Sequence, residues 1–304
     1  MRILITGATG LIGQEIVKLC HEKDIQVHYL TTSKSKIENQ ENYKGFYWNP
    51  KDEYIDTQCF DGVDTIIHLA GATVAKRWTP AYKKTIINSR KNTTELLINN
   101  LKGENHQIKH VVSASAIGVY PDSLTNYYDQ TFNQISPTFL GKVVHIWEKA
   151  VDGFAKVGVE VSKIRIGLVL SEKGGALPQM AKPIKLGLGA AFGSGKQWQS
   201  WIHITDLARM FLYVAENQLS GIYNGVAPNT VSNTDVTKTV AKVLKKPLFL
   251  PNIPQFFMKL VLGEMHILLF ESQRVSSKTI EDKGFHYKFN YLEPALIDLL
   301  GTES

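Results

Sequence analysis

The stretch Gly7-Ala8-Thr9-Gly10-Leu11-Ile12-Gly13 lies between an apolar run, Arg2–Thr6, and a segment with helical periodicity, Leu11–Cys20. In a strand–turn–helix unit that binds a dinucleotide, one glycine makes the tight turn, a second lets the backbone approach the pyrophosphate, and a third lets helix and strand pack closely. The helix N-terminus adds free N–H groups for the phosphates. A second strand-like run, Ile25–Thr31, follows at the expected distance. The sequence therefore predicts a dinucleotide site at this turn, contacted by Gly7, Thr9, Gly10, Leu11, Ile12 and Gly13.

Strand-like and helix-like segments continue to alternate as far as residue 170. Val63–Ala70 is a near-continuous apolar run, typical of a strand that is covered on both faces of a parallel sheet. Pro80 suits a first helical turn, and the helix that it begins is expected to end near Lys102. The other predicted elements are a strand at His110–Ala116, a helix at Pro137–Lys156 and a strand at Val159–Leu170. This order predicts an α/β fold in which residues 1–170 form a Rossmann-type, doubly wound parallel sheet.

The pattern changes after residue 170, where glycines cluster between Gly174 and Gly195 and suggest long loops over the carboxyl ends of the strands. The short elements predicted after them are a strand at Trp201–Ile204, a helix from Asp206 with Thr205 as its cap, a strand at Ile222–Gly225, and helices at Val236–Leu244 and Leu292–Leu300. Residues 171–304 are therefore expected to form a smaller C-terminal α+β substrate lobe. A part of it near 220–245 is a candidate to return to the Rossmann sheet.

The composition argues against several function classes. The formal net charge is +6, but the lysines stand singly or in pairs, so we expect no nucleic-acid partner. No apolar stretch is long enough for a transmembrane helix, so we expect no membrane partner either. The two cysteines, Cys20 and Cys59, have neither metal-ligand spacing nor a disulfide framework, which predicts no metal and a cytoplasmic location. The expected partner is a small-molecule substrate, and the chain is expected to be a monomer or a homodimer.

The end of the second predicted strand bears on the choice between NAD and NADP. An acidic residue at this point would hold the adenosine ribose hydroxyl of NAD. The chain has Thr31-Thr32-Ser33-Lys34-Ser35-Lys36 instead. Hydroxyl and ammonium groups suit a 2′-phosphate, which a carboxylate would repel. The sequence therefore favours NADP over NAD, with Thr31, Thr32 and Lys34 as predicted contacts, and the alternative is a solvated loop that happens to contain lysines.

Several further motifs are distinctive in combination, and they extend over essentially the whole chain. They are His68-Leu69-Ala70-Gly71, Lys76-Arg77-Trp78-Thr79, Ser113-Ala114-Ser115, Trp147-Glu148, Gly193–Gln197, Trp201–Ile204, Tyr223–Pro228, Leu262-Gly263-Glu264 and Gly284-Phe285. With the glycine-rich turn, this set resembles an atypical branch of the extended short-chain dehydrogenases/reductases. That branch is the epimerase family of NAD(P)-dependent proteins with a C-terminal domain of unknown function. The resemblance implies the Rossmann fold and NADP(H) binding, and it names no substrate.

The resemblance also implies roles for residues at two strand ends. It puts Leu69, Ala70 and Gly71 beside the cofactor, and small residues at the end of a buried strand leave room for a ligand. It makes Ser115 the hydroxyl that hydrogen-bonds the reacting oxygen, with Ser113 as the alternate. The other interpretation of either serine is a strand-end hydroxyl that bonds to the backbone.

The catalytic pair of short-chain dehydrogenases is missing from its expected place. These enzymes use a tyrosine four residues before a lysine, one helical turn apart, and the lysine ammonium lowers the pKa of the phenol. Counting back from Glu148, the tyrosine position falls on Leu140 and the lysine position on Val144. The only Tyr-x-x-x-Lys, at residues 47–51, lies in a segment interpreted as turn-rich before the predicted strand at residues 63–70. Tyr120, after the serine strand, is the candidate substitute, and its alternative role is to pack the loop.

Three other side chains are weaker substitutes: Lys142 and His145 have the pattern of surface residues, and His203 that of a core histidine. Two hypotheses follow. In the first, the chain is an NADP(H)-dependent oxidoreductase or epimerase acting on a nucleotide sugar or another small carbonyl or hydroxyl compound; Ser115 orients the substrate, and Tyr120 or an ordered water moves the proton. In the second, it is a catalytically impaired NADP(H)-binding sensor or structural protein. The apparent substrate cleft favours the first.

Overall fold

The computed structural model describes residues 1–102 and 106–301, and its centre is a nine-stranded sheet. The order across the sheet is β13-β9-β7-β6-β1-β2-β4-β3, with β5 paired to β4. The strands are β1 Arg2–Thr6, β2 Gln26–Thr31, β3 Asn39–Gln40, β4 Tyr43–Asn49, β5 Tyr54–Ile55, β6 Thr65–His68, β7 His110–Ala116, β9 Glu160–Ile166 and β13 Gly221–Gly225. All neighbours from β13 to β4 are parallel, and only β3 and β5 run antiparallel to β4. The structure confirms the predicted α/β class and its parallel sheet.

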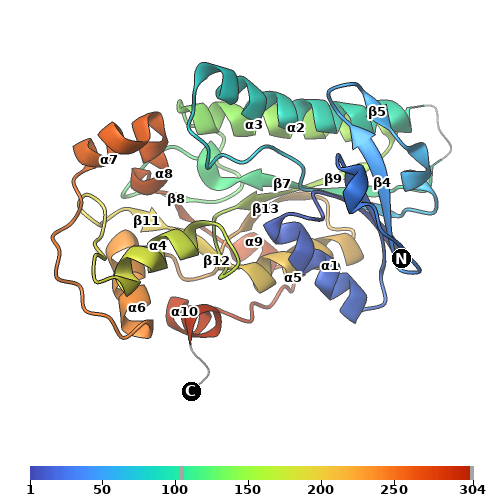
Figure 1. The fold of residues 1–304 in the computed structure, drawn as a ribbon. Coiled ribbons are helices and arrows are strands. Elements are labelled where there is room, and N and C mark those ends of the chain that lie inside the picture. Colours follow the sequence, from blue (N-terminus) through green and yellow to red (C-terminus); the bar gives the residue numbers. More distant parts are fainter. Residues whose placement is uncertain (103–105, 302–304) are drawn as a thin grey trace.

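Helices cover both faces of this sheet (Figure 1). One layer contains α2 and α3, which pack against each other, and the opposite layer contains α1 and α5. The bounds are α1 Leu11–Glu22, α2 Pro80–Leu101, α3 Phe139–Val151 and α5 Ile204–Glu216. Because both faces are covered, Ile3, Leu4 and Ile5 of β1 are fully buried although they point to alternate sides. The continuous apolar runs of the sequence follow from this double coverage.

A second, smaller apolar core lies in the C-terminal half of the chain, around Leu177, Trp201 and Leu296. The helices of this half are α4 Ala176–Lys185, α6 Asn233–Val243, α7 Gln255–Leu262, α8 Ile267–Phe270, α9 Lys278–Glu281 and α10 Leu292–Leu300. Three two-stranded pairs accompany them: β10 Leu168–Leu170 with β12 Trp201–His203, β11 Trp198–Gln199 with β14 Val231–Ser232, and β15 Arg274–Val275 with β8 Tyr127–Tyr128 from the N-terminal half. β13 belongs to the large sheet, where it pairs with β9.

Four local predictions from the sequence are wrong at least in part. The segment interpreted as turn-rich begins inside β4, which pairs with β2 and carries the buried side chains Phe46 and Trp48, and the turn covers only residues 50–53. The strand expected at 159–170 breaks at Gly167, where a Cβ atom would lie 2.1 Å from the Ser200 carbonyl oxygen. The helix predicted at Pro137–Lys156 is α-helical as α3 only to Val151 and continues as a 3-10 helix over Asp152–Val157. The cap of α5 is His203, whose ring nitrogen accepts from the Thr205 backbone N–H.

The part of the chain that the structure describes contains neither a membrane-spanning helix nor a cluster of metal-binding side chains. Within residues 1–102 and 106–301, no helix has the length and apolar character needed to cross a bilayer. In the same part of the chain, no group of three or more His, Cys, Asp or Glu side chains is arranged to hold a metal ion.

Candidate dinucleotide-binding site

The glycine-rich turn joins β1 to α1 at the carboxyl edge of the sheet. Gly7 has a φ of +76°, a conformation that side chains disfavour, and its carbonyl accepts from the Gly10 N–H at 2.9 Å. A Cβ atom on Gly13 would lie 2.2 Å from the Gly7 oxygen, so only glycine allows the helix to start this close to the strand. α1 begins without a side-chain cap and without an acidic residue in its first turn. Its free N–H groups are therefore available to phosphate.

A buried hydrogen-bond chain fixes the neighbouring loop that follows β6. The Thr6 hydroxyl accepts from the Leu69 and Ala70 backbone N–H groups at 3.0 and 3.1 Å, and it donates to Nδ1 of His68 at 2.8 Å. His68 is fully buried, and its burial lowers the pKa of the ring to about 4, so the ring is neutral at pH 7. Its Nε2 then donates to Thr94 of α2 at 3.0 Å. The chain holds residues 69–71 against Gly7, whose added Cβ would touch Leu69 at 3.3 Å.

The Arg90 side chain of α2 closes this edge from the other side. Its Nη1 donates to the Ala72 and Ile86 carbonyl oxygens at 3.1 Å, and its guanidinium stacks on the Trp147 ring at 4.9 Å. Burial lowers the pKa of Arg90 to about 10. Among the residues that the structure describes, no carboxylate pairs with it. A cation thus lies beside Gly71, where its added Cβ would meet the guanidinium carbon at 3.2 Å.

The end of β2 has the hydroxyl and ammonium groups expected from the sequence. Thr31 is buried and its hydroxyl accepts from the Ser33 N–H, whereas Thr32 and Lys34 are exposed. The Lys34 ammonium lies 5.0 Å from the centre of the Tyr47 ring on β4, and β4 pairs with β2 at this point. From Thr31 to Ile37 the chain contains no acidic residue. This loop is a cationic rim at the same sheet edge as the glycine-rich turn.

The serine predicted to orient a substrate is part of a buried ionic network. Ser115, Arg165 and Asn224 stand in register on β7, β9 and β13, so their side chains share one face. Ser115 donates to Glu148 of α3 at 2.5 Å, and Arg165 donates two hydrogen bonds to the same carboxylate at 2.8 and 2.9 Å. Burial alone would raise the pKa of Glu148, but the hydrogen bonds and charge of Arg165 outweigh it and lower the pKa. The proton of Ser115 is therefore committed to Glu148.

Tyr120 joins the same network from the loop after β7. Its ring is fully buried, its hydroxyl donates to Asn224 at 2.8 Å, and the same oxygen accepts from Arg165 at 3.0 Å. Burial raises the pKa of Tyr120, against the opposing effect of Arg165. Ser113 is also fully buried, and its hydroxyl donates to the Ala114 carbonyl oxygen at 3.0 Å. The structure thus brings Ser115 and Tyr120 together through Arg165, within the protein interior.

The helix positions of the missing catalytic pair are apolar in structure as well as in sequence. Val144 is 3% exposed and packs in an apolar cluster with Val119, Tyr128 and Val226. Leu140 is half-buried, and its Cβ would touch a Cβ added to Gly118 at 3.4 Å. The weaker substitutes lie elsewhere: Lys142 and His145 are exposed on α3, and His203 is buried against Phe289.

Residues 3–225 match the family model of the NAD dependent epimerase/dehydratase family. The chain belongs to this family. Residues 253–299 match a second model, described as a domain of unknown function (DUF1731). Relatives include the epimerase family protein SAR0825 of Staphylococcus aureus, 36% identical over 98% of both chains. Another is the epimerase family protein SH2119 of Staphylococcus haemolyticus, 35% identical over 98% of this chain and 99% of that protein.

Solved structures agree with this assignment. The human epimerase family protein SDR39U1 (isoform 2), solved with NADPH, superposes with a TM-score of 0.84 at 29% identity, covering 98% of this chain and 99% of that one. The UDP-glucuronic acid 4-epimerase from Bacillus cereus has a TM-score of 0.77 at 15% identity, covering 98% of each chain, which shows a shared fold. This epimerase-family chain therefore has a NAD(P)-binding Rossmann fold.

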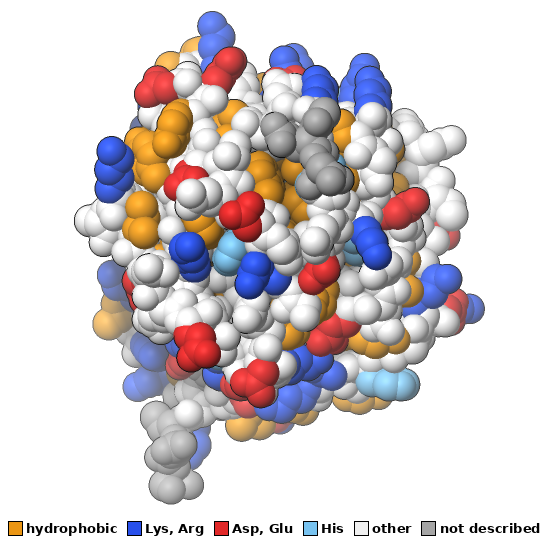
Figure 2. All heavy atoms as spheres, turned by 90° about the vertical axis from the view of Figure 1, so that its right-hand side faces the viewer, with side chains coloured by type: hydrophobic (Ala, Val, Ile, Leu, Met, Phe, Trp, Pro, Cys, Tyr) orange, Lys and Arg blue, Asp and Glu red, His pale blue; other side chains and the backbone are white. Residues whose placement is uncertain are grey.

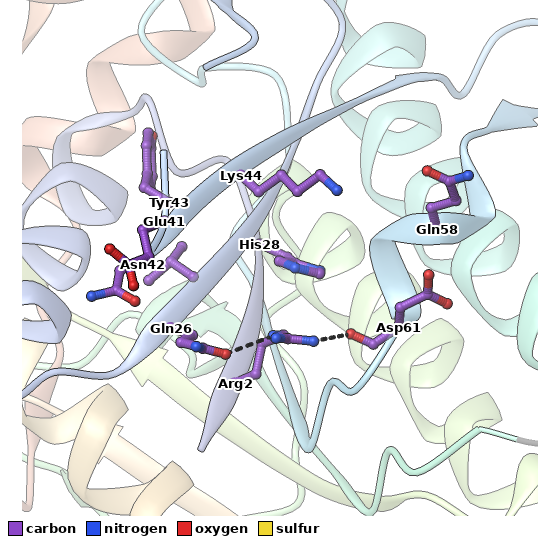
Figure 3. Close-up of a pocket in the computed structure, with 10 residues that line it drawn as sticks. Arg2, Gln26, His28, Glu41, Asn42, Tyr43, Lys44, Gln58 and Asp61 are labelled. Atoms are coloured by element: carbon purple, nitrogen blue, oxygen red, sulfur yellow. Dashed lines mark hydrogen bonds between the residues drawn. The ribbon is translucent and has the colours of Figure 1, made fainter. Parts of the chain in front are cut away.

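Sequence reasoning missed most of the polar partners around this epimerase-family site. Thr6 and His68 belong to segments that the sequence singles out, Arg2–Thr6 and His68–Gly71. Their hydrogen bonds, however, depend on β1 and β6 being neighbours in the sheet, which the order of the strands along the chain does not reveal. Arg90 reaches the edge only because α2 packs on α3. A separate hollow of about 190 Å³ lies at the amino ends of β1, β2 and β4, where Arg2 donates to Gln26 and to the Asp61 carbonyl oxygen (Figure 3). Ligands of doubly wound sheets bind at the opposite edge.

Proposed function

We propose that this chain binds NADP(H) at the carboxyl edge of β1, β2 and β6 and acts as an oxidoreductase on a small carbonyl or hydroxyl compound, of which nucleotide sugars are the first class to test. The proposal rests on the uncapped N-terminus of α1, whose position depends on Gly7 and Gly13. This N-terminus lies at the same sheet edge as the loop after β2, which contains lysines and hydroxyl side chains but no acidic residue from Thr31 to Ile37. The NADPH in the structure of human SDR39U1 supports it.

Different residues would bind different parts of the cofactor. The N–H groups at the start of α1 bind the pyrophosphate, Lys34 and the Thr32 hydroxyl bind the 2′-phosphate, and residues 69–71 form the wall beside the ribose. When bound, the nicotinamide supplies the hydride chemistry. Because Ser115 donates to Glu148 and Tyr120 to Asn224, the proton is proposed to come from solvent water. A cytoplasmic location and a monomeric or dimeric state stay predictions.

A second candidate function is an NADP(H)-binding sensor without turnover. The specific observation in its favour is the apolar surrounding of Leu140 and Val144, together with the locked hydroxyls of Ser115 and Tyr120. Both candidates need the same cofactor site. They differ only in whether bound NADPH is oxidised by a substrate.

The test is a fluorescence titration with NADPH and NADH, followed by oxidation assays with a panel of carbonyl compounds and nucleotide sugars. We expect Lys34→Ala to raise the Kd for NADPH about tenfold, the size of one charge-assisted hydrogen bond near the surface, and to leave NADH unchanged. Lys44→Ala is the matched control, because Lys44 also lies over an aromatic ring but faces the opposite sheet edge. Absence of binding to either nucleotide would refute the proposal, and binding without oxidation would favour the sensor.

A further inference from the structure

An apolar surface is exposed at the end of the molecule formed by the C-terminal half. The eight residues of α7 include no buried side chain, and Phe256 and Leu260 are 74% and 80% exposed one helical turn apart. Phe249, in the loop before α7, is 78% exposed. The other large apolar side chains exposed here are Leu186, Leu188, Leu250, Phe257 and Val261. Singly exposed apolar side chains are ordinary, but a group of this size marks an interaction site.

Backbone contacts bring these side chains together from two parts of the sequence. The Ile253 N–H donates to the Ala191 carbonyl oxygen at 2.8 Å, and the Ile253 carbonyl accepts from the Gly193 N–H at 2.8 Å. Leu248 packs on Gly189, and α4 packs on α6. The segment around Leu188 therefore lies beside the segment that leads to α7, at the left in Figure 1.

Two longer stretches around these segments, each bounded directly by acidic residues (Glu172 and Asp206, Asp235 and Glu264), contain all of the chain's excess positive charge. Residues 173–205 and 236–263 contain nine lysines and neither aspartate nor glutamate. The lysines are Lys173, Lys182, Lys185, Lys196, Lys238, Lys242, Lys245, Lys246 and Lys259. Of the 34 basic and 28 acidic residues of the whole chain, 25 basic and all 28 acidic residues lie outside these two stretches. At the opposite end of the molecule, basic and acidic side chains are interspersed (Figure 2).

Most of these lysines border the apolar surface. Lys182 and Lys185 are exposed on α4 just before Leu186, and Lys245 and Lys246 are exposed just before the loop that contains Phe249. Lys259 lies on α7 itself. Within residues 1–102 and 106–301, no carboxylate pairs with any of these five, although Lys242 pairs with Glu293. We call the five lysines and the eight apolar residues the basic apolar face.

The charge decides between possible occupants of this face. A second copy of the chain, related by a two-fold axis, would bring the lysines of both copies together, and Glu264, the acidic residue that follows α7, is already paired with Lys83. A nucleic acid would use the lysines but would gain little from exposed leucines and phenylalanines on a convex helix. A membrane surface uses both, because aromatic and aliphatic side chains enter the headgroup boundary while lysines meet anionic lipid.

We propose that the basic apolar face docks this protein on the surface of an anionic lipid bilayer. Phe249, Phe256 and Leu260 enter the interface, and the five lysines contact acidic headgroups. The sequence predicted no membrane partner because it has no apolar stretch long enough to cross a bilayer, a criterion that does not detect a surface assembled from separate segments. The proposal does not depend on the cofactor, so NADPH titration tests the proposed function separately.

The experiment is co-sedimentation of the full chain with vesicles of phosphatidylcholine alone and with vesicles in which about a third of the lipid is phosphatidylglycerol. We expect binding only to the anionic vesicles, with loss of binding at high salt. Each lysine near such a surface contributes about fivefold to partitioning, so Lys245→Glu/Lys246→Glu should weaken binding by about 25-fold or more. Lys18→Glu/Lys91→Glu is the matched control, because it changes the net charge equally on exposed helices elsewhere.

Phe256→Ser/Leu260→Ser tests the apolar part, with Tyr54→Ser as the control at a distant exposed aromatic. All of these positions are exposed, so circular dichroism should show unchanged folding. The proposal is overturned if anionic vesicles do not bind the protein at low salt, or if the face variants bind as well as the controls. It is also overturned if the apolar variant abolishes a dimer in sedimentation velocity without changing vesicle binding, or if duplex DNA binds and vesicles do not.

Discussion

Replacement of Glu148 by alanine tests whether the ionic network between α3 and the sheet holds the two together. Glu148 is 8% exposed and accepts two hydrogen bonds from Arg165, which is 6% exposed, and one from Ser115. Glu148→Ala leaves the guanidinium buried with the Tyr120 hydroxyl as its remaining partner in this network. Removing one member of a buried ion pair costs about 3–5 kcal/mol, because the other charge stays desolvated without compensation. We expect a loss of that size in the free energy of unfolding.

Urea denaturation followed by circular dichroism measures this loss, with Glu95→Ala as the control, since Glu95 forms an exposed pair with Lys91 and should cost less than about 0.5 kcal/mol. Glu148→Leu/Arg165→Leu should recover part of the stability, because no charge then remains buried. The pKa of Glu148 is lowered by folding, so its contribution is complete above the unfolded pKa of about 4.3 and disappears as the pH falls through the folded pKa. A loss below about 1 kcal/mol for Glu148→Ala would refute the reasoning.

Two further predictions concern the cofactor edge. Gly13→Ala places a Cβ 2.2 Å from the Gly7 carbonyl oxygen, which cannot move without opening the turn, so NADPH affinity should fall at least about 100-fold; Gly174→Ala, whose added Cβ meets nothing closer than 3.6 Å, should bind normally in the same titration. The His68 ring should titrate near pH 4 by NMR; because its folded pKa lies below the unfolded value of about 6.5, wild-type stability should fall as the pH drops from about 6.5 to 4, and titration of His68 near pH 6.5 would contradict the neutral Thr6–His68–Thr94 chain.

The parts of the fold that depend on local patterns were predictable. The glycine spacing of the first turn and the continuous apolar runs specify β1, α1 and the buried strands, because each signal is confined to neighbouring residues. β4 was missed because Tyr43–Asn49 contains Gly45 and ends near Pro50, and both suggest a turn. The strand forms because Gly45 leaves room for the Tyr29 ring, whose atoms lie 2.5 Å from an added Cβ.

The residues of the candidate site likewise fall into those that local sequence predicts and those that only the packed structure reveals. The residues of the glycine-rich turn follow from sequence, since one segment makes both the turn and the helix N-terminus. The partners of Ser115 and Tyr120 come from α3, β9 and β13, and the most distant of them along the chain, Asn224, is 104 residues from Tyr120. Their register across the sheet is a property of the packed structure. The concentration of lysines into one face is equally invisible in a sequence where they stand singly or in pairs.

The apolar positions on α3 lead to a last prediction about the missing catalytic pair. Val144→Lys would place an ammonium group at a position that is 3% exposed, in an apolar cluster with Tyr120, whose hydroxyl already accepts from the Arg165 guanidinium. A buried lysine without a carboxylate partner should destabilise the chain by about 3 kcal/mol or more in urea denaturation, against less than about 0.5 kcal/mol for the exposed Lys142→Ala. Because position 140 is half-exposed, the single variant Leu140→Tyr should fold. The double variant Leu140→Tyr/Val144→Lys should not gain the ability to oxidise NADPH. A stable double variant with new turnover would contradict this. Such turnover would show that α3 still has room for a proton relay. A double variant without turnover would mean that the core around Val144 is packed for valine, so that two substitutions cannot restore the pair.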